Sequence, residues 1–555
     1  MSRKNNFRNE FAEGIFYHKY AQGNNDTWWN LAYRLVDDVC GGFGGKGDPL
    51  LSREDREEIV ELIYQRKFIP GGRYLYYAGR DAHYWNNCYL LRAEEDTREE
   101  WGRIAHVSSD CLMSGGGIGT DYSRLREGGI TLSRTGGLSS GPLPLMCSVN
   151  EIGRNVMQGG SRRSAIYASL DWTHGDINEF LKIKNWKDYP VGNTNLWEVK
   201  QTDFNFPAPL DHTNISVNYD DSWLDMADRN NDEVFLANCM QAMMTGEPGF
   251  SFNFGDKQNE TLRNACTEVT SEDDSDVCNL ASVNLSAIDS LEEFKDVVQL
   301  ASKFLICGTL RADLPYEKVY QVREKNRRLG LGLMGIHEWL LKRGSDYSVT
   351  PELHKWLAVY ESESENSANQ LADWVGCSRP VAYRAIAPTG SISILAQTTS
   401  GIEPVIYNAY KRRYLVDGKK WKYQFVVDAT ARYLVEELGV DPNGIETSVT
   451  LSEDFEKRIK FQADVQDYVD MAISSTINLS EWGSKSNNED RVEEFAGILA
   501  RYAPRIRGFT AYPDGSRGGQ PITEIPYEEA MKHQGVEFSE HDICDISGRG
   551  GTCST

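Results

Sequence analysis

The sequence predicts an α/β fold with mostly parallel strands. From Cys88 onward, short strand-like runs alternate with helix-like runs: AIYASLDW, TNISVNY and GFSFNF are typical of strands, and GDINEFLKIK and NDEVFLANCMQAMMTG of helices. Longer helices are expected near residues 290–307 and 352–375. Because parallel strands are joined by helical crossovers, this regular alternation favours a parallel α/β arrangement.

Residues 1 to about 80 are expected to be mainly helical. Thr27 is a plausible N-cap for the run WWNLAYRLVDDVC, which carries apolar residues at helical spacing. Ser52, followed by two acidic residues, suits the start of a second helix. The chain beyond about residue 510 is rich in glycine and polar residues, and its end is expected to be flexible. These patterns divide the chain into a helical region at 1–80, a strand–helix domain at 81–510 and a C-terminal segment at 511–555.

The composition is that of a large, folded, acidic protein. The 555 residues are 40% hydrophobic and 11% aromatic, and the net charge is −23 at pH 7. This length suggests several domains or one large α/β barrel with additions. Binding to nucleic acid would need a basic face, so no nucleic acid is expected as a partner. A phosphate-bearing substrate would need local basic residues or helix N-termini.

No segment suggests export or insertion into a membrane. The first residues, MSRKNNFRNEFAEG, lack the apolar stretch of a signal peptide, and no run approaches the roughly 18 apolar residues of a membrane span. Eleven cysteines are scattered without a disulfide framework, which indicates reduced thiols in the cytoplasm. There is no CxxC pair, so we expect no structural zinc and no other metal site.

The run Asn264-Ala265-Cys266-Thr267-Glu268 is the first candidate for chemistry. If it is extended, the period of two places the amide, the thiol and the carboxylate on one face. Cys278 follows twelve residues after Cys266, before another strand-like run. The alternative is a buried structural cysteine beside a capping asparagine, because free cysteine often acts as a small hydrophobe.

Two loops are candidates for binding anions. In APTGSIS, residues 387–393, a strand leads into a turn that places backbone N–H groups and hydroxyls at a helix start. In QGGSRRS, residues 158–164, two arginines follow a glycine pair, and they would suit contacts with phosphate or with base edges. The alternatives are an ordinary capped helix for the first loop and a solvated loop for the second.

Cys544 and Cys553 lie within twelve residues of the C-terminus, separated by glycine-rich sequence. Two thiols on a mobile tail can carry reducing equivalents by thiol–disulfide exchange. The alternative is a frayed tail that carries incidental cysteines.

Gly330, Gly332 and Gly335 satisfy the dinucleotide-binding pattern GxGxxG, but they follow EKNRR and not an apolar strand. No acidic residue stands at the right place after a second strand, so the Rossmann context is missing. We interpret these glycines as sites of close helix packing.

The order of these pieces resembles the catalytic subunit of ribonucleotide reductases. The resemblance covers the chain from about residue 70 to its end and rests on PGGRYLYYAG, NNCYLL, SGGGIGTDYSRLR, QGGSRRSA, NISV, NACTE, CNLASVNLSAI, RRLGLGLMG, APTGSISILA, TSGIEPV and the paired cysteines of the tail. It implies a ten-stranded α/β barrel of two five-stranded halves, with a finger loop carrying Cys266 through its centre.

The resemblance also implies roles for the reacting groups. Cys266 would form the thiyl radical that takes the 3′ hydrogen of the ribose, and Glu268 would be the general base at the 3′-OH. Asn264 would hydrogen-bond the substrate hydroxyls. Cys88 and Cys278 would be the dithiol that becomes a disulfide as the 2′-OH leaves as water. Cys544 and Cys553 would re-reduce that disulfide, although their spacing is wider than the common pattern, and would exchange with a thioredoxin- or glutaredoxin-like protein.

Further positions are carried over for the substrate and for a deoxynucleotide effector at a homodimer interface. Arg126 matches the nucleotide-binding arginine of the effector site, and the loop from Gln158 to Arg163 matches the segment that relays effector identity. The N-terminal region lacks the pattern of the ATP-cone activity module, so no overall control by dATP is expected. The substrate residues are Asn87, Gly117, Pro388, Thr389, Gly390, Ser391, Ile392 and Ser393, with the phosphates at 389–393. The effector residues are Glu95, Asp96, Arg126, Arg134, Gln158, Arg162 and Arg163.

The radical source is suggested by the segment FTAYPDGSRGGQPIT. Oxygen-dependent reductases receive the radical through two adjacent tyrosines, but here Tyr512 is followed by Pro513. The glycyl-radical class lacks the glutamate at i+2 from the cysteine and has a different tail. YPDGSRGGQP looks like the adenosylcobalamin-dependent class, which needs no radical-generating partner subunit and uses no histidine ligand to cobalt. The compact length also resembles phage-encoded versions.

Other functions remain open on the sequence alone. The same catalysis could be fed by a separate radical-generating subunit, although the missing tyrosine pair argues against this. A non-catalytic nucleotide-binding homologue should have lost one of Cys88, Cys266, Glu268 or Cys278, and all four are present. An NAD-linked oxidoreductase rests on the GxGxxG glycines alone. Diphosphate substrates are favoured over triphosphates.

Overall fold

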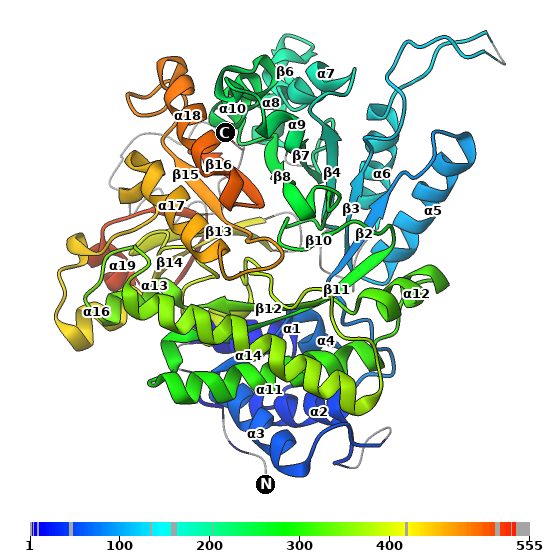
Figure 1. Ribbon diagram of the computed structural model, residues 1–555. Helices are drawn as coiled ribbons and strands as arrows, with labels where there is room; N and C mark the ends of the chain where they lie inside the picture. The colour runs from blue at the N-terminus through cyan, green and yellow to red at the C-terminus, as the bar shows by residue number, and fades with distance from the viewer. Residues whose placement is uncertain are drawn as a thin grey trace.

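The computed structural model describes residues 3, 5–7, 10–43, 48–133, 136–156, 164–203, 205–416, 420–516, 522–533 and 536–539. Within these ranges no helix combines the length and the apolarity that crossing a bilayer requires. Figure 1 shows a ring of strands with helices outside it and the N-terminal helices packed below.

The N-terminal region is helical, as the sequence predicts. Thr27 caps the second helix, its hydroxyl oxygen accepting from the N–H of Asn30 at 3.1 Å, and Ser52 caps the third in the same way. These helices are α1 (Glu10–Lys19), α2 (Trp28–Cys40) and α3 (Arg53–Tyr64), followed by strand β1 (Phe68–Pro70) and the short helix α4 (Gly72–Tyr77).

The first half of the ring contains five parallel strands. They are β2 (Cys88–Arg92), β3 (Gly117–Asp121), β4 (Ile166–Asp171), β7 (Thr213–Tyr219) and β8 (Gly249–Phe252), paired in that order. The crossovers contain α5 (Arg98–Met113), α6 (Leu143–Asn155), α7 (Ile177–Lys182), the hairpin β5 (Pro190–Val191) and β6 (Thr194–Asn195), α8 (Leu196–Thr202), α9 (Asp221–Leu224) and α10 (Glu233–Thr245).

The second half also has parallel neighbours. Strand β11 (Asp276–Asn284) pairs with β12 (Leu329–Met334), and β15 (Thr476–Leu479) pairs with β16 (Gly508–Pro513). Between β12 and β15 runs a segment joined only by isolated parallel bridges, Leu331 to Arg384 and Ile386 to Ile473. The connections contain α11 (Leu291–Arg311), α12 (Glu317–Asn326), α13 (Ile336–Lys342), α14 (Pro351–Val375), α15 (Ile392–Ala396), α16 (Ala429–Leu438), α17 (Phe455–Gln466) and α18 (Val492–Tyr502).

The two halves meet antiparallel, through β11 against β2 and β16 against β8. The ladders and the two bridges therefore connect ten segments into a ring of two five-stranded halves, with β1 added outside it against β11. This pairing agrees with the architecture that the resemblance implies, with one of the ten strands reduced to isolated bridges.

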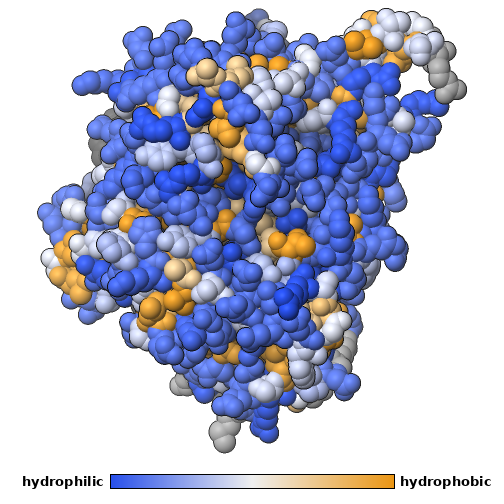
Figure 2. Space-filling view, viewed as in Figure 1, coloured by the Kyte–Doolittle hydropathy of each residue, from blue (hydrophilic) through white to orange (hydrophobic). Residues whose placement is uncertain are grey.

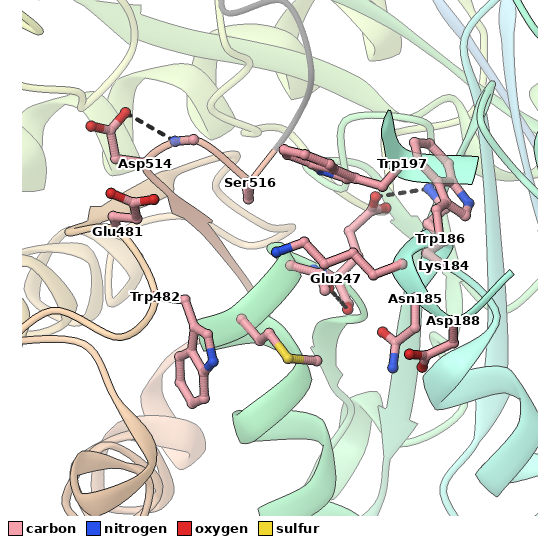
Figure 3. A pocket seen from close by; sticks show the side chains of 14 residues that line it. Lys184, Asn185, Trp186, Asp188, Trp197, Glu247, Glu481, Trp482, Asp514 and Ser516 are labelled. Carbon is pink, nitrogen blue, oxygen red and sulfur yellow. Dashed lines mark hydrogen bonds and ion pairs between the residues drawn. The ribbon is translucent and has the colours of Figure 1, made fainter. Parts of the chain in front are cut away.

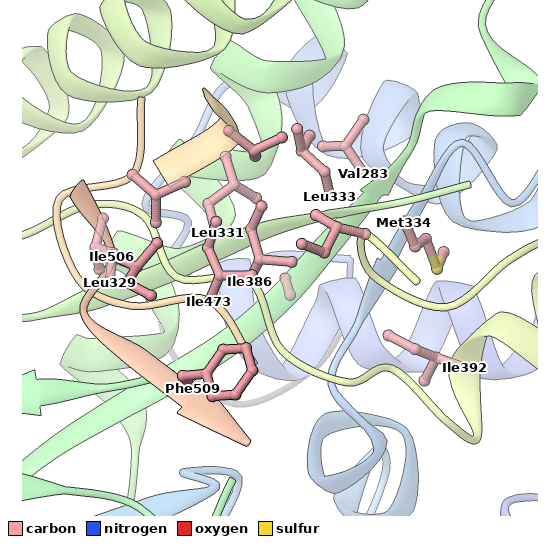
Figure 4. Close-up of a cluster of buried hydrophobic side chains, with 14 of the residues drawn as sticks. Val283, Leu329, Leu331, Leu333, Met334, Ile386, Ile392, Ile473, Ile506 and Phe509 are labelled. Carbon is pink, nitrogen blue, oxygen red and sulfur yellow. The ribbon is translucent and has the colours of Figure 1, made fainter. Parts of the chain in front are cut away.

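Gly330 and Gly332 lie on strand β12 and Gly335 follows it as the N-cap of α13, so the interpretation of the first two as sites of helix packing was wrong. On this strand they alternate with leucines whose side chains are buried in the apolar layer of Figure 4. Helix α11 packs against both β11 and β12. A Cβ on Gly330 would stand 2.9 Å from the sulfur of Cys278, and one on Gly332 would stand 2.7 Å from the carbonyl of Ala385. The glycines therefore permit close approach of neighbouring strands.

A separate antiparallel sheet lies beside the ring. Its central hairpin is β13 (Ala409–Val416) and β14 (Lys420–Val427), flanked by β17 (Ile522–Glu524) and β18 (Glu537–Ser539), with α19 (Tyr527–His533) against it. Strands β17 and β18 of the C-terminal segment thus pair with β13 and β14, which lie about one hundred positions earlier in the sequence. The surface seen from the same side is mostly hydrophilic, with scattered apolar residues (Figure 2).

Candidate active site

A short hairpin between β8 and β11 carries the run that the sequence singled out. Its stem pairs β9 (Leu262–Arg263) with β10 (Thr270–Ser271). The hairpin contacts β2 and β3, and it approaches β3 so closely that a Cβ on Gly119 would lie 1.7 Å from the carbonyl oxygen of Arg263. A glycine on β3 is therefore needed for the hairpin to pass.

The tip of this hairpin is a turn, so the extended conformation expected for residues 264–268 was wrong. The N–H of Thr267 donates to the carbonyl of Asn264 at 2.9 Å, and Thr267 has a φ of 70°. The turn leaves Cys266 exposed at its corner while Asn264 and Glu268 are each 1% exposed. The three residues still form one site, but through a turn and not through a shared strand face.

The side chains of two asparagines help to fix the tip. The Asn264 amide donates to the sulfur of Cys88 at 3.0 Å, and its oxygen accepts from the N–H of Val269 at 2.9 Å. From β7, the amide of Asn214 donates to the carbonyl of Ala265 at 2.9 Å. Asn264 therefore links the Cys266 turn to the cysteine on β2.

Cys88 and Cys278 face each other across the antiparallel pair of β2 and β11. Directly opposed residues in such a pair have Cα atoms about 4.5–5.5 Å apart, within the range that a disulfide spans. Both are buried free thiols, and burial raises their pKa well above the usual cysteine value. They are therefore protonated at neutral pH, and their Cα register is compatible with a disulfide.

Glu268 provides a carboxyl group in this cavity, and the pKa of that group is shifted. Burial raises its pKa to about 7, and the hydrogen bond from Asn264 opposes that shift. Its Oε2 is buried without a hydrogen-bond partner among the described residues. A carboxylate with a free oxygen and a pKa near neutrality suits a general base for a bound hydroxyl group.

These groups line one open cavity of about 370 Å³. Sequence reasoning missed Arg73, Ala165 and Ser282 there, although Arg73 lies in the quoted PGGRYLYYAG motif. Ser393 is buried outside the lining and shares a hydrogen bond with Ser400 at 2.8 Å. Cys278 adjoins the lining through Cys88. The residues from the sequence prediction that do line the cavity are Asn87, Cys88, Gly117, Asn264, Cys266, Glu268, Pro388, Thr389, Gly390, Ser391 and Ile392.

The loop at 387–392 is held in an unusual shape. Thr389 has a φ of 53°, and its hydroxyl oxygen accepts from the N–H of Gly401 at 2.9 Å. Helix α15 begins at Ile392, after the strand segment and turn that the sequence predicted. A β-branched residue in the left-handed region is strained, and such strain gathers at ligand sites.

A second hollow brings together part of the predicted effector site. Arg126 pairs with Asp96, and both line the hollow beside Trp101 and Leu125. Glu95 is exposed and does not line it. Arg134, Gln158, Arg162, Arg163, Cys544 and Cys553 lie outside the described residues.

A third hollow was not predicted from the sequence. It is lined by three tryptophans, Trp186, Trp197 and Trp482, and has a volume of about 370 Å³, the same as the cavity at Cys266 (Figure 3). Its wall contains the ion pair of Lys184 and Glu247, at 2.7 Å. It draws on five segments, near 184–188, 197, 244–247, 481–482 and 514–516, so no local pattern could have found it.

This tryptophan hollow adjoins the Cys266 turn through the start of β7. Lys184 donates to the carbonyl of Thr213, and Glu247 accepts from the N–H of Ile215 at 2.9 Å. Asn214, between them, holds the carbonyl of Ala265. The wall of the hollow and the tip of the hairpin are thus attached to consecutive residues of one strand.

Comparison with known proteins agrees with this site. The family model described as "Ribonucleotide reductase, barrel domain" matches residues 86–232, 239–361 and 376–502. A "Vitamin B12-dependent ribonucleoside-diphosphate reductase" of Mycobacterium tuberculosis is 25% identical over 89% of this chain and 77% of its own. A "Putative adenosylcobalamin-dependent ribonucleoside-triphosphate reductase" of Mycobacterium phage D29 is 26% identical over 81% and 73%.

A solved structure is similar in fold. The class Id ribonucleotide reductase alpha subunit of Actinobacillus ureae superposes with a TM-score of 0.68, covering 91% of this chain and 97% of that one, at 17% identity. The family model spans most of the barrel strands described above. The chain therefore belongs to the ribonucleotide reductase barrel-domain family.

Proposed function

We propose that this protein reduces ribonucleotides, with diphosphates as the preferred substrates, to 2′-deoxyribonucleotides with adenosylcobalamin as the radical source. The observation that carries the proposal is the meeting of an exposed cysteine, a buried carboxyl of pKa about 7 and an opposed pair of buried thiols around one cavity. The names of the relatives, both cobalamin-dependent, support the choice of cofactor.

Each residue has a definite role in the proposed reaction. The Cys266 thiyl takes the 3′ hydrogen atom of the ribose and later returns one. The Glu268 carboxylate accepts the 3′-OH proton, which is possible because its Oε2 has no partner among the described residues. The 2′-OH leaves as water with a proton from the dithiol. Cys88 and Cys278 supply two electrons and two hydrogens in all and end as a disulfide, so the atoms and electrons balance.

Adenosylcobalamin supplies, when bound, a carbon-centred radical next to Cys266 by homolysis of its cobalt–carbon bond. We assign the tryptophan hollow to this group, because it is open and because its wall and the Cys266 turn are held by consecutive residues of β7. Trp186, Trp197 and Trp482 offer flat apolar surfaces for a macrocycle, and the rim at Asn185, Asp188 and Ser516 offers polar groups for its amide side chains (Figure 3).

Regulation and re-reduction complete the proposal. A deoxynucleotide effector would bind the hollow beside Asp96 and Arg126, where the guanidinium can contact phosphate. The functional unit would be a homodimer in the cytoplasm. A thioredoxin- or glutaredoxin-like protein would recycle the dithiol through Cys544 and Cys553.

One anaerobic assay tests the function. The pure protein is incubated with a ribonucleoside diphosphate, a deoxynucleotide effector and dithiothreitol, with and without adenosylcobalamin, and deoxynucleotide is measured. We expect product only with the cofactor. Product without it would overturn the choice of cofactor. Absence of product with both diphosphates and triphosphates would overturn the proposal of a self-sufficient enzyme and favour one that needs a separate radical-generating subunit.

A second assay tests the tail. The double substitution Cys544→Ser with Cys553→Ser should stop turnover with a protein reductant but leave turnover with dithiothreitol. Equal loss with both reductants would contradict a redox role and assign the tail a structural one.

A further inference from the structure

The N-terminal helix reaches the cavity at the predicted phosphate loop. Helix α1 packs against α15, and the ammonium of Lys19, in the last turn of α1, donates to the hydroxyl of Ser391 at 3.2 Å. The two residues are 372 positions apart in the chain. Ser391 lines the substrate cavity, so an exposed lysine from outside the barrel family match stands at its edge.

Helix α1 is fixed in this position by its apolar face. Ala12 and Phe16 are fully buried, and Phe16 packs edge-on to Trp28 of α2. On the other side, the guanidinium of Arg412 from β13 lies 4.2 Å from the ring of Phe11. The placement of Lys19 therefore follows from packing along the whole helix and not from one surface contact.

The cavity needs positive charge that its own lining scarcely supplies. A nucleoside diphosphate carries two to three negative charges, and the protein has a net charge of −23. The loop residues Thr389, Gly390 and Ser391 are neutral. The one cation of the described lining, Arg73, donates to the backbone carbonyls of Tyr84 and Ser114.

The loop is open to the cavity at Gly390. A Cβ built on Gly390 would meet nothing within 4 Å. A lysine ammonium has three donors on a flexible stem, so it can keep a hydroxyl contact and still turn towards an anion at the same loop. The reach of Lys19 to Ser391 shows that this stem is long enough.

We propose that Lys19 is a substrate-specificity residue that binds the terminal phosphate of the ribonucleotide at the loop around Ser391. This inference rests on the proposed function and deepens it, because it names the side chain that distinguishes a nucleoside diphosphate from a monophosphate. It also makes the docking of helix α1 part of substrate binding.

The test compares Lys19→Met, Lys19→Arg and a control, Lys295→Met, which removes an exposed lysine of α11 whose nearest acidic partner, Glu363, is 4.0 Å away. KM and kcat are measured for CDP, together with the affinities for CDP and CMP by equilibrium dialysis. We expect Lys19→Met to raise KM and Kd for CDP about tenfold, with kcat and the affinity for CMP unchanged, because a contact made equally in ground and transition states affects KM alone. Lys19→Arg should restore most of the affinity, and Lys295→Met should resemble the wild type.

Three outcomes would overturn the inference. They are an unchanged affinity for CDP, an equal loss for CDP and CMP, or a loss in Lys19→Met that is accompanied by a lower melting temperature and not restored by arginine. The last result would mean that Lys19 stabilises the packing of helix α1 and does not bind the substrate. Failure of the proposed function is separate, since a wild-type protein that makes no deoxynucleotide still yields the CDP and CMP affinities that decide the role of Lys19.

Discussion

Cys266 and the Cys88–Cys278 pair place the same side chain in opposite settings. Cys266 stands exposed at the corner of a turn, whereas the pair is buried within a ladder whose register sets the two residues opposite each other. A thiol that exchanges hydrogen atoms with two different ligands needs access. A dithiol that must close into a disulfide needs fixed geometry and protection from water, and burial keeps both of its sulfurs protonated.

Removing the exposed thiol should have the largest effect. Cys266→Ala should abolish turnover, because Cys88, the other described cysteine of the cavity lining, is buried and belongs to the proposed dithiol. Stability should change by less than about 0.5 kcal/mol, as for most exposed positions. Product assays, nucleotide binding and thermal unfolding check this together. Residual multiple turnover would contradict the radical role of Cys266.

The buried pair should behave as one unit. Cys88→Ser, Cys278→Ser and the double variant should lose multiple turnover to the same extent, because a disulfide needs both sulfurs and effects within such a unit do not add. Rates with dithiothreitol as reductant measure this.

A matched control separates chemistry from packing. Cys239, on α10, is also a fully buried free thiol. Cys239→Ser should lower the free energy of unfolding by about 1–3 kcal/mol, as burying a hydroxyl does, without loss of turnover. If either cysteine of the pair behaved like this control, the dithiol assignment would be wrong.

Glu268 lines the same cavity as Cys266 and Cys88, and its titration should make the activity depend on pH. Because burial raises its pKa in the free protein to about 7, the basic form becomes the majority only above that pH, so kcat/KM should rise through pH 7 and level off. Glu268→Gln should lose this rise together with most of the activity. A wild-type profile that is flat between pH 6 and pH 8 would show that this carboxylate is not the base.

The same shift sets a stability prediction of defined sign. The folded state holds the Glu268 proton up to about pH 7, whereas the unfolded chain releases it near the ordinary glutamate pKa of 4.5. Folding stability from this group is therefore fully present below the unfolded value and is lost as the pH rises through 7, by about 3 kcal/mol. Denaturant unfolding at pH 5 and pH 8 should show a smaller loss in Glu268→Gln than in the wild type.

Local patterns in the sequence predict much of the fold. The caps at Thr27 and Ser52 and the alternation of strands and helices are local signals, and the structure confirms them. Residues 329–334 show where local reading failed. The alternation of leucine and glycine there has the period of a strand. The same residues also match GxGxxG, and the interpretation as helix packing followed from that match.

The site was predictable as a set of residues but not as a geometry. The turn at Thr267 depends on a left-handed residue that no propensity favours. The facing of Cys88 and Cys278 depends on a pairing between strands nearly two hundred residues apart. The tryptophan hollow and the contact of Lys19 with Ser391 likewise join distant segments, so only the folded chain reveals them.

The smallest expected effect tests what holds the exposed cysteine in place. Asn214→Ala removes a hydrogen bond from β7 to the turn, at the carbonyl of Ala265, and leaves every reacting group intact. Because a hydrogen bond contributes about 1 kcal/mol, kcat should fall roughly fivefold, with KM and the melting temperature unchanged. Asn264→Ala, which cuts the link to Cys88 inside the cavity, should cost more. If the two variants were equally impaired, the turn would be positioned as a rigid body. If only Asn264→Ala were impaired, the contact with the buried cysteine would be the one that aligns the two thiol settings.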